Sequence, residues 1–278
     1  MIKTMGGNMR QGKVSLPASF LIAFCLVMLP CGCGGGEKNR PMGQRIEKKA
    51  ESKPRLIVLP LKPQEGQVYN GIGLGVHFLL GNVVAPHTGF KEFWFGWRVK
   101  KIFPDKKAFQ GYCRNADDKL DLVPLSQSQK VRYWLSGNYG DASVRLHFFD
   151  GKTPGAVHRP ADLAISVDDG LVAFRVQLTQ WLSSVGRPMP RDQIQAALWP
   201  EKISSKGLDA VGRALEDFYG YSAYGGDGPL DVSPFEKAVA LAPGSFMAQD
   251  LYGWALYRNR DYKAAREAGR RRYEKVNK

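Results

Sequence analysis

Histidine and aspartate side chains are the candidates for acid–base chemistry in this chain. The four histidines are His77, His87, His147 and His158. They are scattered along the chain and lack the spacing of metal ligands. Asp168 and Asp169 are adjacent, so in a strand their carboxylates would point to opposite faces and could not pair. No G-x-S-x-G nucleophile motif is present either. We therefore expect that the protein is not an enzyme, with a hydrolase whose site is assembled only in the fold as an alternative.

Three closely spaced glycines, Gly71, Gly73 and Gly75, raise the question of a phosphate-binding loop. The dinucleotide fingerprint needs its first glycine directly after a strand and a third glycine where Val76 stands. Here residues 62–70 separate the expected strand from the glycines. The pattern therefore predicts no bound nucleotide, and we expect no cofactor.

Cysteine is the remaining chemically active residue type. The four cysteines are Cys25, Cys31, Cys33 and Cys113. They form no C-x-x-C pair and no disulfide framework, so we expect no metal ion. Cys31 and Cys33 follow basic residues and an unbroken apolar run over residues 20–29, which is shorter than the roughly 20 residues that span a bilayer. This order indicates an export signal.

Residues 1–33 resemble a bacterial lipoprotein signal peptide, in which a small residue precedes the cysteine that is acylated, with a fatty acid such as palmitate, and becomes the mature N-terminus. Gly32 precedes Cys33, which is the expected lipid-attachment residue. Cys31 is the alternative, but it follows Pro30, whose ring would obstruct cleavage. A signal peptide without lipid or an uncleaved anchor also stays open. The resemblance implies a lipid-anchored protein that faces the periplasm, and Gly34 in place of a retention aspartate favours the outer membrane.

The formal net charge is +14, so the positions of the basic residues matter for the choice of partner. Residues 37–55 hold seven basic and three acidic side chains and few large apolar ones, which predicts a disordered tether over residues 34–54. Residues 258–278 hold nine basic and three acidic side chains, typical of a solvated helix near its C-terminus. A periplasmic address argues against nucleic acid as a partner.

Residues 55–187 have the pattern of a small α/β domain. We expect a buried strand at residues 56–61, helices at 69–84 and 171–185, and a hairpin of strands at 131–137 and 142–149. The segments RLIVLPL, NGIGLGVHFLL, VRYWLSGNYGDASVRLHFFDGKTPG and LVAFRVQLTQWLSSVG resemble the amino-terminal domain of TolB and its relatives. This resemblance implies a mixed-sheet α/β fold that mediates protein contacts and has no catalytic residues. On the hairpin, we expect His147 to be a surface or hydrogen-bonded strand residue.

An aromatic segment at residues 90–103 interrupts this pattern. Phe93, Phe95 and Trp97 alternate, so on a strand they would share one face and belong to the core. The alternative is an exposed docking patch that includes Trp94 and Trp97, because aromatic residues are frequent at interface hot spots. Residues 88–130 otherwise match no pattern that we can assign.

Residues 188–278 are expected to be helical. Apolar stripes mark helices near residues 208–218 and 235–242, with Ser233 as the N-cap of the latter, and Ser245 and Asp261 cap two more. The segment FEKAVALAPGSFMAQDLYGWALYRNRDYKAAREA resembles tetratricopeptide repeats. Three repeats are usually needed for a stable solenoid, so an alternative is a two- or four-helix appendage packed on the α/β domain.

These observations predict an α/β domain followed by an all-α, tetratricopeptide-like helical-hairpin module, in a lipoprotein that is held at the membrane by its lipid and binds an unidentified envelope protein. The candidate interaction surface consists of Trp94, Trp97, Tyr252, Tyr257 and Tyr262. The alternative function is a periplasmic domain that senses or binds a small molecule in a pocket of the α/β domain.

Overall fold

The computed structural model describes residues 54–87, 90–92, 94–152, 157–165, 171–185, 202–226 and 228–276. Residues 51–278 form one compact unit. Cys31 and Cys33 lie outside the described residues, as do Asp168 and Asp169. Within the described part of the chain, no helix is both long and apolar enough to cross a membrane.

The centre of the described unit is a mixed β-sheet. Its strands are β1 (Arg55–Val58), β2 (Lys62–Pro63), β3 (Lys91–Glu92), β4 (Tyr133–Tyr139), β5 (Ser143–Asp150) and β6 (Val157–Ala164). The strand order is β3-β1-β4-β5-β6, and β2 pairs with β4. β1 runs parallel to β3 and β4, whereas β4, β5 and β6 are joined antiparallel. The α/β class expected from the sequence is therefore present.

The predicted hairpin is confirmed as β4 and β5, with Leu135 opposite Phe148 and Ser136 opposite His147. Residues that face each other across a pair lie on the same side of the sheet. The side that carries Leu135 and Phe148 is apolar, and the Phe148 ring centroid lies 6.5 Å from that of Trp181. The opposite side carries Ser136 and His147.

Helices cover both sides of the sheet. The predicted buried strand is confirmed as β1, which has its last three residues buried, and the predicted helices are confirmed as α1 (Ile72–His87) and α5 (Val172–Val185). α1 contacts β1 and β4, and α5 contacts β6. On the other side, the Trp134 indole N–H donates a hydrogen bond of 2.6 Å to Ser126 Oγ on α4 (Leu122–Gln129).

The segment without an assigned pattern forms short helices. They are the 3-10 helix η2 (Phe95–Trp97), α2 (Val99–Ile102), α3 (Lys106–Arg114) and α4. The strand expected to carry Phe95 and Trp97 on one core face is wrong, because Phe95 is buried while Trp97 is 69% exposed. A Cβ added at Gly96 would lie 2.8 Å from the Tyr219 ring, so the close contact of this turn with α7 requires glycine at position 96.

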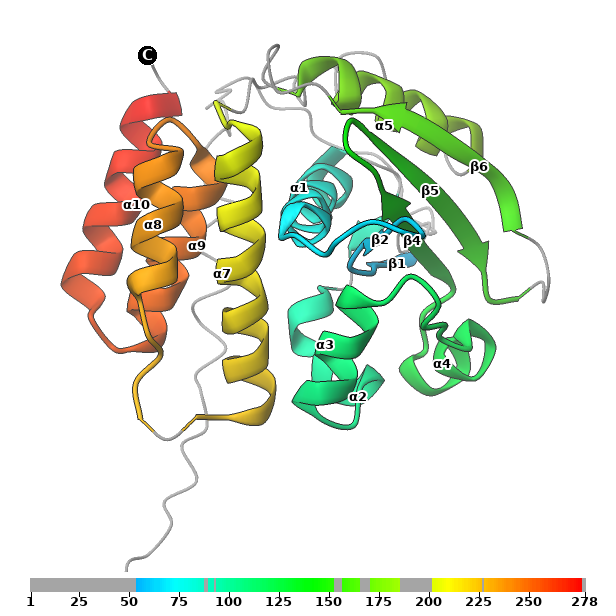
Figure 1. The fold of residues 1–278 in the computed structure, drawn as a ribbon, viewed down its shortest axis with the longest axis horizontal. Helices are drawn as coiled ribbons and strands as arrows, with labels where there is room; N and C mark the ends of the chain where they lie inside the picture. Colours follow the sequence, from blue (N-terminus) through cyan, green and yellow to red (C-terminus); the bar gives the residue numbers. More distant parts are fainter. Residues whose placement is uncertain are drawn as a thin grey trace, which may run out of the picture. The chain divides into compact units, whose positions relative to one another are not determined.

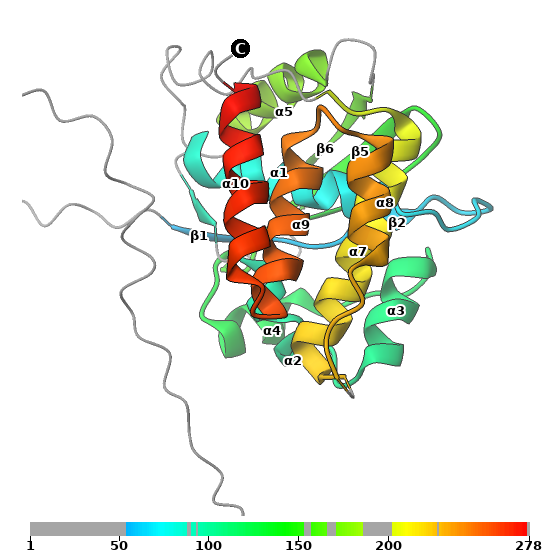
Figure 2. The same ribbon diagram turned by 90° about the vertical axis from the view of Figure 1, so that its left-hand side faces the viewer.

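The C-terminal part is helical, as expected. It contains α7 (Ser205–Tyr224), α8 (Ser233–Leu241), α9 (Phe246–Arg258) and α10 (Tyr262–Val276). Figure 1 shows α7 between α1 and the α8–α10 helices, and Figure 2 shows α8, α9 and α10 side by side. Ser245 and Asp261 accept hydrogen bonds from the backbone N–H groups of Ala248 and Ala264, which confirms both as N-caps.

The expected role of Ser233 as an N-cap is wrong. Its backbone N–H and its hydroxyl both donate to Asp231 Oδ1, at 3.0 and 2.8 Å. These hydrogen bonds lower the pKa of the Asp231 carboxyl, the backbone N–H having the larger effect. The carboxylate is the stronger acceptor at this position, so Ser233 becomes a donor inside the first turn.

Candidate functional site

The glycine-rich start of α1 is a helix-packing surface. A Cβ added at Gly212 of α7 would lie 1.7 Å from the Gly71 carbonyl oxygen, and one added at Gly75 would lie 2.5 Å from the Leu208 carbonyl oxygen. Cβ atoms in proteins essentially never approach other atoms that closely. The two helices therefore touch backbone to backbone, and this contact explains why glycines recur at these positions.

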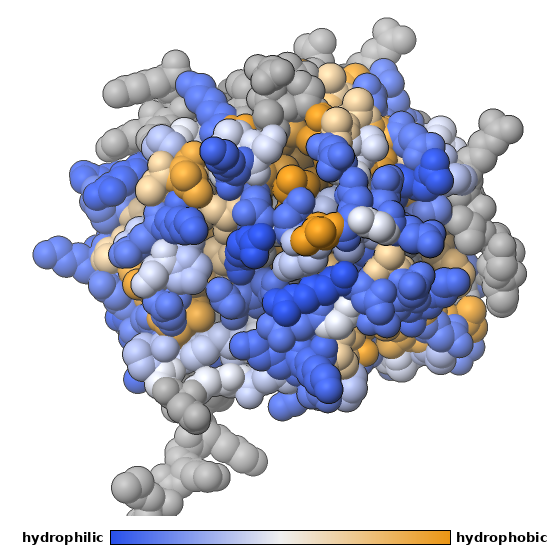
Figure 3. Space-filling model, in the orientation of Figure 1, coloured by the Kyte–Doolittle hydropathy of each residue, from blue (hydrophilic) through white to orange (hydrophobic). Residues whose placement is uncertain are grey.

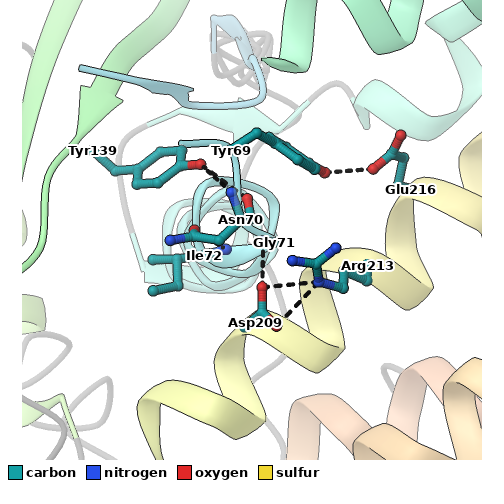
Figure 4. A network of polar contacts seen from close by, with 8 residues as sticks. All are labelled: Tyr69, Asn70, Gly71, Ile72, Tyr139, Asp209, Arg213 and Glu216. Atoms are coloured by element: carbon teal, nitrogen blue, oxygen red, sulfur yellow. Dashed lines mark hydrogen bonds and ion pairs between the residues drawn. The ribbon is translucent and has the colours of Figure 1, made fainter. Parts of the chain in front are cut away.

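A carboxylate of the chain itself occupies the N-terminal end of α1 (Figure 4). The Gly71 N–H donates a 2.6 Å hydrogen bond to Asp209 Oδ1, and Arg213 Nε lies 3.1 Å from both Asp209 oxygens. Asn70 Oδ1 accepts from the Ile72 N–H at 3.0 Å. Because helix N-termini favour negative charge, Asp209 takes the place that a phosphate would take in a nucleotide-binding loop.

Two tyrosines extend this network on either side of α1. The Tyr139 hydroxyl accepts from the Asn70 N–H at 3.0 Å and donates to the Asn70 carbonyl at 2.9 Å. The Tyr69 hydroxyl donates to Glu216 Oε2, while Arg114 Nη2 lies 2.7 Å from Glu216 Oε1. Burial and the hydrogen bond to Glu216 raise the pKa of Tyr69, so its hydroxyl stays protonated. The network thus joins α1, α3 and α7 and has the character of a structural connection.

His77 and Cys113 are also structural residues. His77 on α1 is 3% exposed, and its Nε2 lies 3.0 Å from the Tyr219 hydroxyl oxygen. Burial lowers the pKa of His77 to about 4. A hydrogen bond with the Leu59 backbone favours the charged ring and acts in the opposite direction, but it is the smaller effect. The Cys113 thiol is buried, and this burial raises its pKa. A thiol of raised pKa is a poor nucleophile, which argues against covalent chemistry at Cys113.

Part of the candidate interaction surface is a connected group of aromatic rings. The Trp94 ring centroid lies 5.8 Å from that of Trp97 and 4.9 Å from that of Trp254 on α9. Trp94 is partly buried, so it supports the exposed Trp97 from beneath. Sequence reasoning missed Trp254; the signal that could have found it is its place in one helical stripe with Leu251 and Ala255.

The tyrosines of the candidate surface divide into two groups. Tyr257 and Tyr262 are 48% and 54% exposed, and their ring centroids lie 5.3 Å apart at the turn between α9 and α10. Tyr257 is three residues after Trp254, so the two lie on the same side of α9. Tyr252 is partly buried and its hydroxyl lies 3.4 Å from Glu236 Oε1 on α8, away from that side. Four of the five candidate residues therefore lie along one route over η2, α9 and the start of α10.

A pocket of about 250 Å³ with a mixed lining, called the polar pocket below for the polar side chains that it gathers, lies on the sheet side that carries Ser136 and His147. Its apolar lining residues are Leu59, Tyr112, Leu120 and Leu122. It is bordered by the strands β2, β4 and β5, by α3, and by the loop that precedes α4. The polar side chains that line it are Lys62, Asp118, Lys119, Ser136, Asn138 and His147. Of these, only His147 was considered as a functional residue from the sequence, and the structure places it at this pocket.

The described residues hold no group of three or more histidine, cysteine, aspartate or glutamate side chains arranged to bind a metal ion. Comparisons of the chain with protein-family models, with curated proteins and with solved structures find no match. Function must therefore be argued from the residues and their geometry.

Proposed function

We propose that this protein is a lipid-anchored, non-enzymatic lipoprotein of the bacterial envelope whose folded part binds another envelope protein. The N-terminal signal pattern with Cys33 supports the anchor, with the protein facing the periplasm and the outer membrane favoured. The order of β1, α1, the β4–β5 hairpin and α5 supports the likeness to the TolB amino-terminal domain, whose role is protein contact.

The observation that carries the proposal is a group of aromatic rings, hereafter the aromatic strip, in which Trp97, Tyr257 and Tyr262 are exposed and Trp94 and Trp254 are partly buried beneath them. A tryptophan side chain that is 69% exposed and supported by a second tryptophan is costly to leave in water. Tryptophan and tyrosine also dominate the binding energy of protein interfaces. Figure 3 shows one face of the molecule, on which hydrophilic residues dominate and apolar ones occur in small groups.

The helices beneath the strip support a repeat-type module. α9 and α10 form an antiparallel hairpin, and a Cβ added at Gly253 would lie 3.8 Å from the Ala268 Cβ and from the Ala265 carbonyl oxygen. Small residues at the crossing point are what the tetratricopeptide pattern requires. We therefore propose that α8, α9 and α10 are a short tetratricopeptide-like array that presents the strip.

The charge around the strip indicates the chemistry of the partner. Arg258, Arg260 and Lys263 are exposed beside Tyr257 and Tyr262, and α10 continues with further arginines. A partner protein with an apolar patch rimmed by acidic residues would match both the rings and the charges. Its association rate should therefore fall as the salt concentration rises.

The test is co-purification of the full chain from native membranes in mild detergent. A stoichiometric partner should be retained by the wild type, lost with Trp97→Ala and with the double variant Tyr257→Ala/Tyr262→Ala, and kept by Val68→Ala. Val68 is 88% exposed and belongs to none of these surfaces, so it is the matched control. A partner that binds all variants equally, or the absence of any stoichiometric partner, would refute the proposed contact.

The anchor has a separate test. Cys33→Ala should release the protein from membranes, and the mass of the wild-type N-terminal peptide should show an acylated Cys33. Cys31→Ala is the control, because Cys31, which follows Pro30 and lies two residues before Cys33, is not the expected site. Continued membrane retention of Cys33→Ala would count against anchoring through that residue.

The second candidate function, recognition of a small molecule, is favoured by a specific observation. The polar pocket gathers two lysines, a histidine, an aspartate and two neutral polar side chains, those of Ser136 and Asn138.

A further inference from the structure

The pocket begins with the side of the β4–β5 hairpin that is polar. Ser136 and His147 face each other, and Asn138 faces Arg145 two pairs further along, on the same side of the sheet. Sheet sides that lie beneath helices are normally apolar, as Leu135 and Phe148 are on the other side. Here α3 and α4 border a part of the sheet whose Ser136, Asn138 and His147 side chains are half-buried and line the pocket.

An irregularity in the parallel pairing brings a lysine to the same place. Val58 pairs with Leu135 and Lys62 pairs with Asn138, so the first strand uses one more residue than β4 between these points. Pro60 lies in this stretch, and a proline cannot donate to the neighbouring strand. The extra residue sets Lys62 on the same side of the sheet as Asn138, next to the Tyr112 ring.

Lys62 holds one wall of the pocket and retains one donor. Its Nζ donates to the carbonyl oxygens of Ala116, at 2.7 Å, and Asp118, at 2.5 Å. An ammonium group has three N–H donors, so one stays available. The Ser136 hydroxyl and the His147 ring likewise form no hydrogen bond with any side chain or backbone group in the part of the chain that the structure describes.

Charged side chains of both signs meet at the pocket. Lys62 and Lys119 border it together with Asp118, and the Asp117 carboxylate also acts on Lys62. Burial lowers the pKa of Lys62, while Asp118 and Asp117 act in the opposite direction. His147 is neutral at pH 7, because burial lowers its pKa and Arg145 lowers it further, whereas Asp162 on β6 acts in the opposite direction. Lys62 retains one N–H donor beside the neutral groups of Ser136 and His147, and this arrangement is complementary to a carboxylate that carries its own polar groups. A volume of about 250 Å³ lies below the usual range for drug-sized ligands.

We propose that this pocket binds a small organic molecule with one carboxylate, which pairs with Lys62 and Lys119 while Ser136, Asn138 and His147 form hydrogen bonds to the polar groups beside it. The site shares no residue with the aromatic strip. It therefore adds a ligand-binding activity to the proposed protein contact, and either can fail without the other.

The direct test follows the His147 ring signals of the full chain in mild detergent by NMR. The probe is N-acetylglycine, and the matched neutral molecule is N-acetylglycinamide, which has the same shape but no charge. We expect saturable shifts of the His147 signals with the acid only. The pKa of His147 should also rise on binding, because a carboxylate placed among Lys62, Lys119 and Asp118 favours the charged ring.

Variants of the lysines assign the contact. Lys119→Met should weaken binding of N-acetylglycine about tenfold or more, the loss expected for one charged hydrogen bond. Lys62→Met should do the same but also releases the loop carbonyls, so its fold is checked by circular dichroism. Lys101→Met on α2 is the control, since that lysine is exposed and remote from the lining residues. Inorganic phosphate serves as a second anion, and acetate as the smallest carboxylate.

Binding of the acid that survives Lys119→Met and a folded Lys62→Met would overturn the proposal. So would equal binding of the amide, or saturation by phosphate with no response to either carboxylate. Binding of N-acetylglycine and not of acetate supports it, and shows in addition that the neighbouring amide group is recognised by Ser136, Asn138 or His147.

Discussion

The contact between α1 and α7 leads to a sharp prediction for Gly212→Ala. The added Cβ would lie 1.7 Å from the Gly71 carbonyl oxygen, where ordinary contact begins at 3.4 Å. The backbone of α7 fixes the position of the Cβ, and the oxygen belongs to the backbone just before α1, so no side-chain rotation can relieve the overlap. The helices must move apart by about the missing distance, and the 2.6 Å hydrogen bond from the Gly71 N–H to Asp209 then exceeds hydrogen-bond length.

The magnitude follows from three terms. Overpacking of a close contact costs about 1–3 kcal/mol. Loss of the hydrogen bond to a charged acceptor adds about 1.5–3 kcal/mol. Alanine is favoured over glycine in a helix by about 1 kcal/mol, which offsets part of the loss. We therefore expect the free energy of unfolding to fall by about 1.5–5 kcal/mol.

The assay is urea unfolding of the full chain, monitored by circular dichroism. Gly269→Ala on α10 is the matched control, because nothing lies within 4 Å of its added Cβ. There the helix propensity acts alone, so this variant should be stabilised by about 0.5–1 kcal/mol. The two variants have the same chemical change and opposite expected signs. Stabilisation of Gly212→Ala to the same extent as Gly269→Ala would refute the backbone contact between α1 and α7.

Three further predictions concern the buried polar residues. Tyr69→Phe removes the donor to the buried Glu216, so unfolding in urea should show a loss of about 1–3 kcal/mol; an unchanged midpoint would contradict this. The pKa of His77 is about 4 when folded and 6.5 when unfolded, so the unfolded chain binds the extra proton between these values. Stability should therefore fall as the pH drops from 6.5 to 4, by up to about 3 kcal/mol, and His77→Phe should lose this part of the pH dependence; identical pH profiles would argue against a neutral buried ring. The Cys113 thiol is buried with a raised pKa, so mass mapping should find it alkylated only in urea, and rapid labelling of the native chain would show that the site is open.

The local sequence predicted those elements whose residues keep a single regular pattern from end to end. The β4–β5 hairpin follows from period-two alternation, and Ser245 and Asp261 follow from the chemistry of N-caps. The short helices between β3 and β4 have weaker sequence patterns, which consist of an N-cap residue and a short apolar stripe. Asp105 accepts from the Ala108 N–H at 2.8 Å and begins α3, whose buried Phe109, Tyr112 and Cys113 are three and four residues apart. A nine-residue helix gives too short a stripe to stand out from the aromatic segment before it.

The function of the glycines at the start of α1 could not be read from their own neighbourhood. Gly71 and Gly75 resemble part of a phosphate-binding loop, but Gly71 lies against α7 and Gly75 against Leu208. The partner that decides between the two interpretations, Asp209, is 138 residues further along the chain. The local sequence shows that the backbone is free of side chains at the glycines. Only the tertiary structure shows whether a ligand or another helix fills the space beside them.

The polar pocket shows the same limit for a sheet. Alternation along the hairpin identifies Ser136 and His147 as residues of the non-core side, and a side that meets solvent has the same pattern as one that borders a polar pocket. The difference arises from the loop before α4, which Lys62 holds through two carbonyl oxygens 54 and 56 residues away. Two of the three N–H donors of Lys62 bind this loop, so Lys62 positions the loop beside the pocket in addition to carrying a charge. Lys62→Met should therefore disturb the pocket more than Lys119→Met, even though the two substitutions remove the same charge.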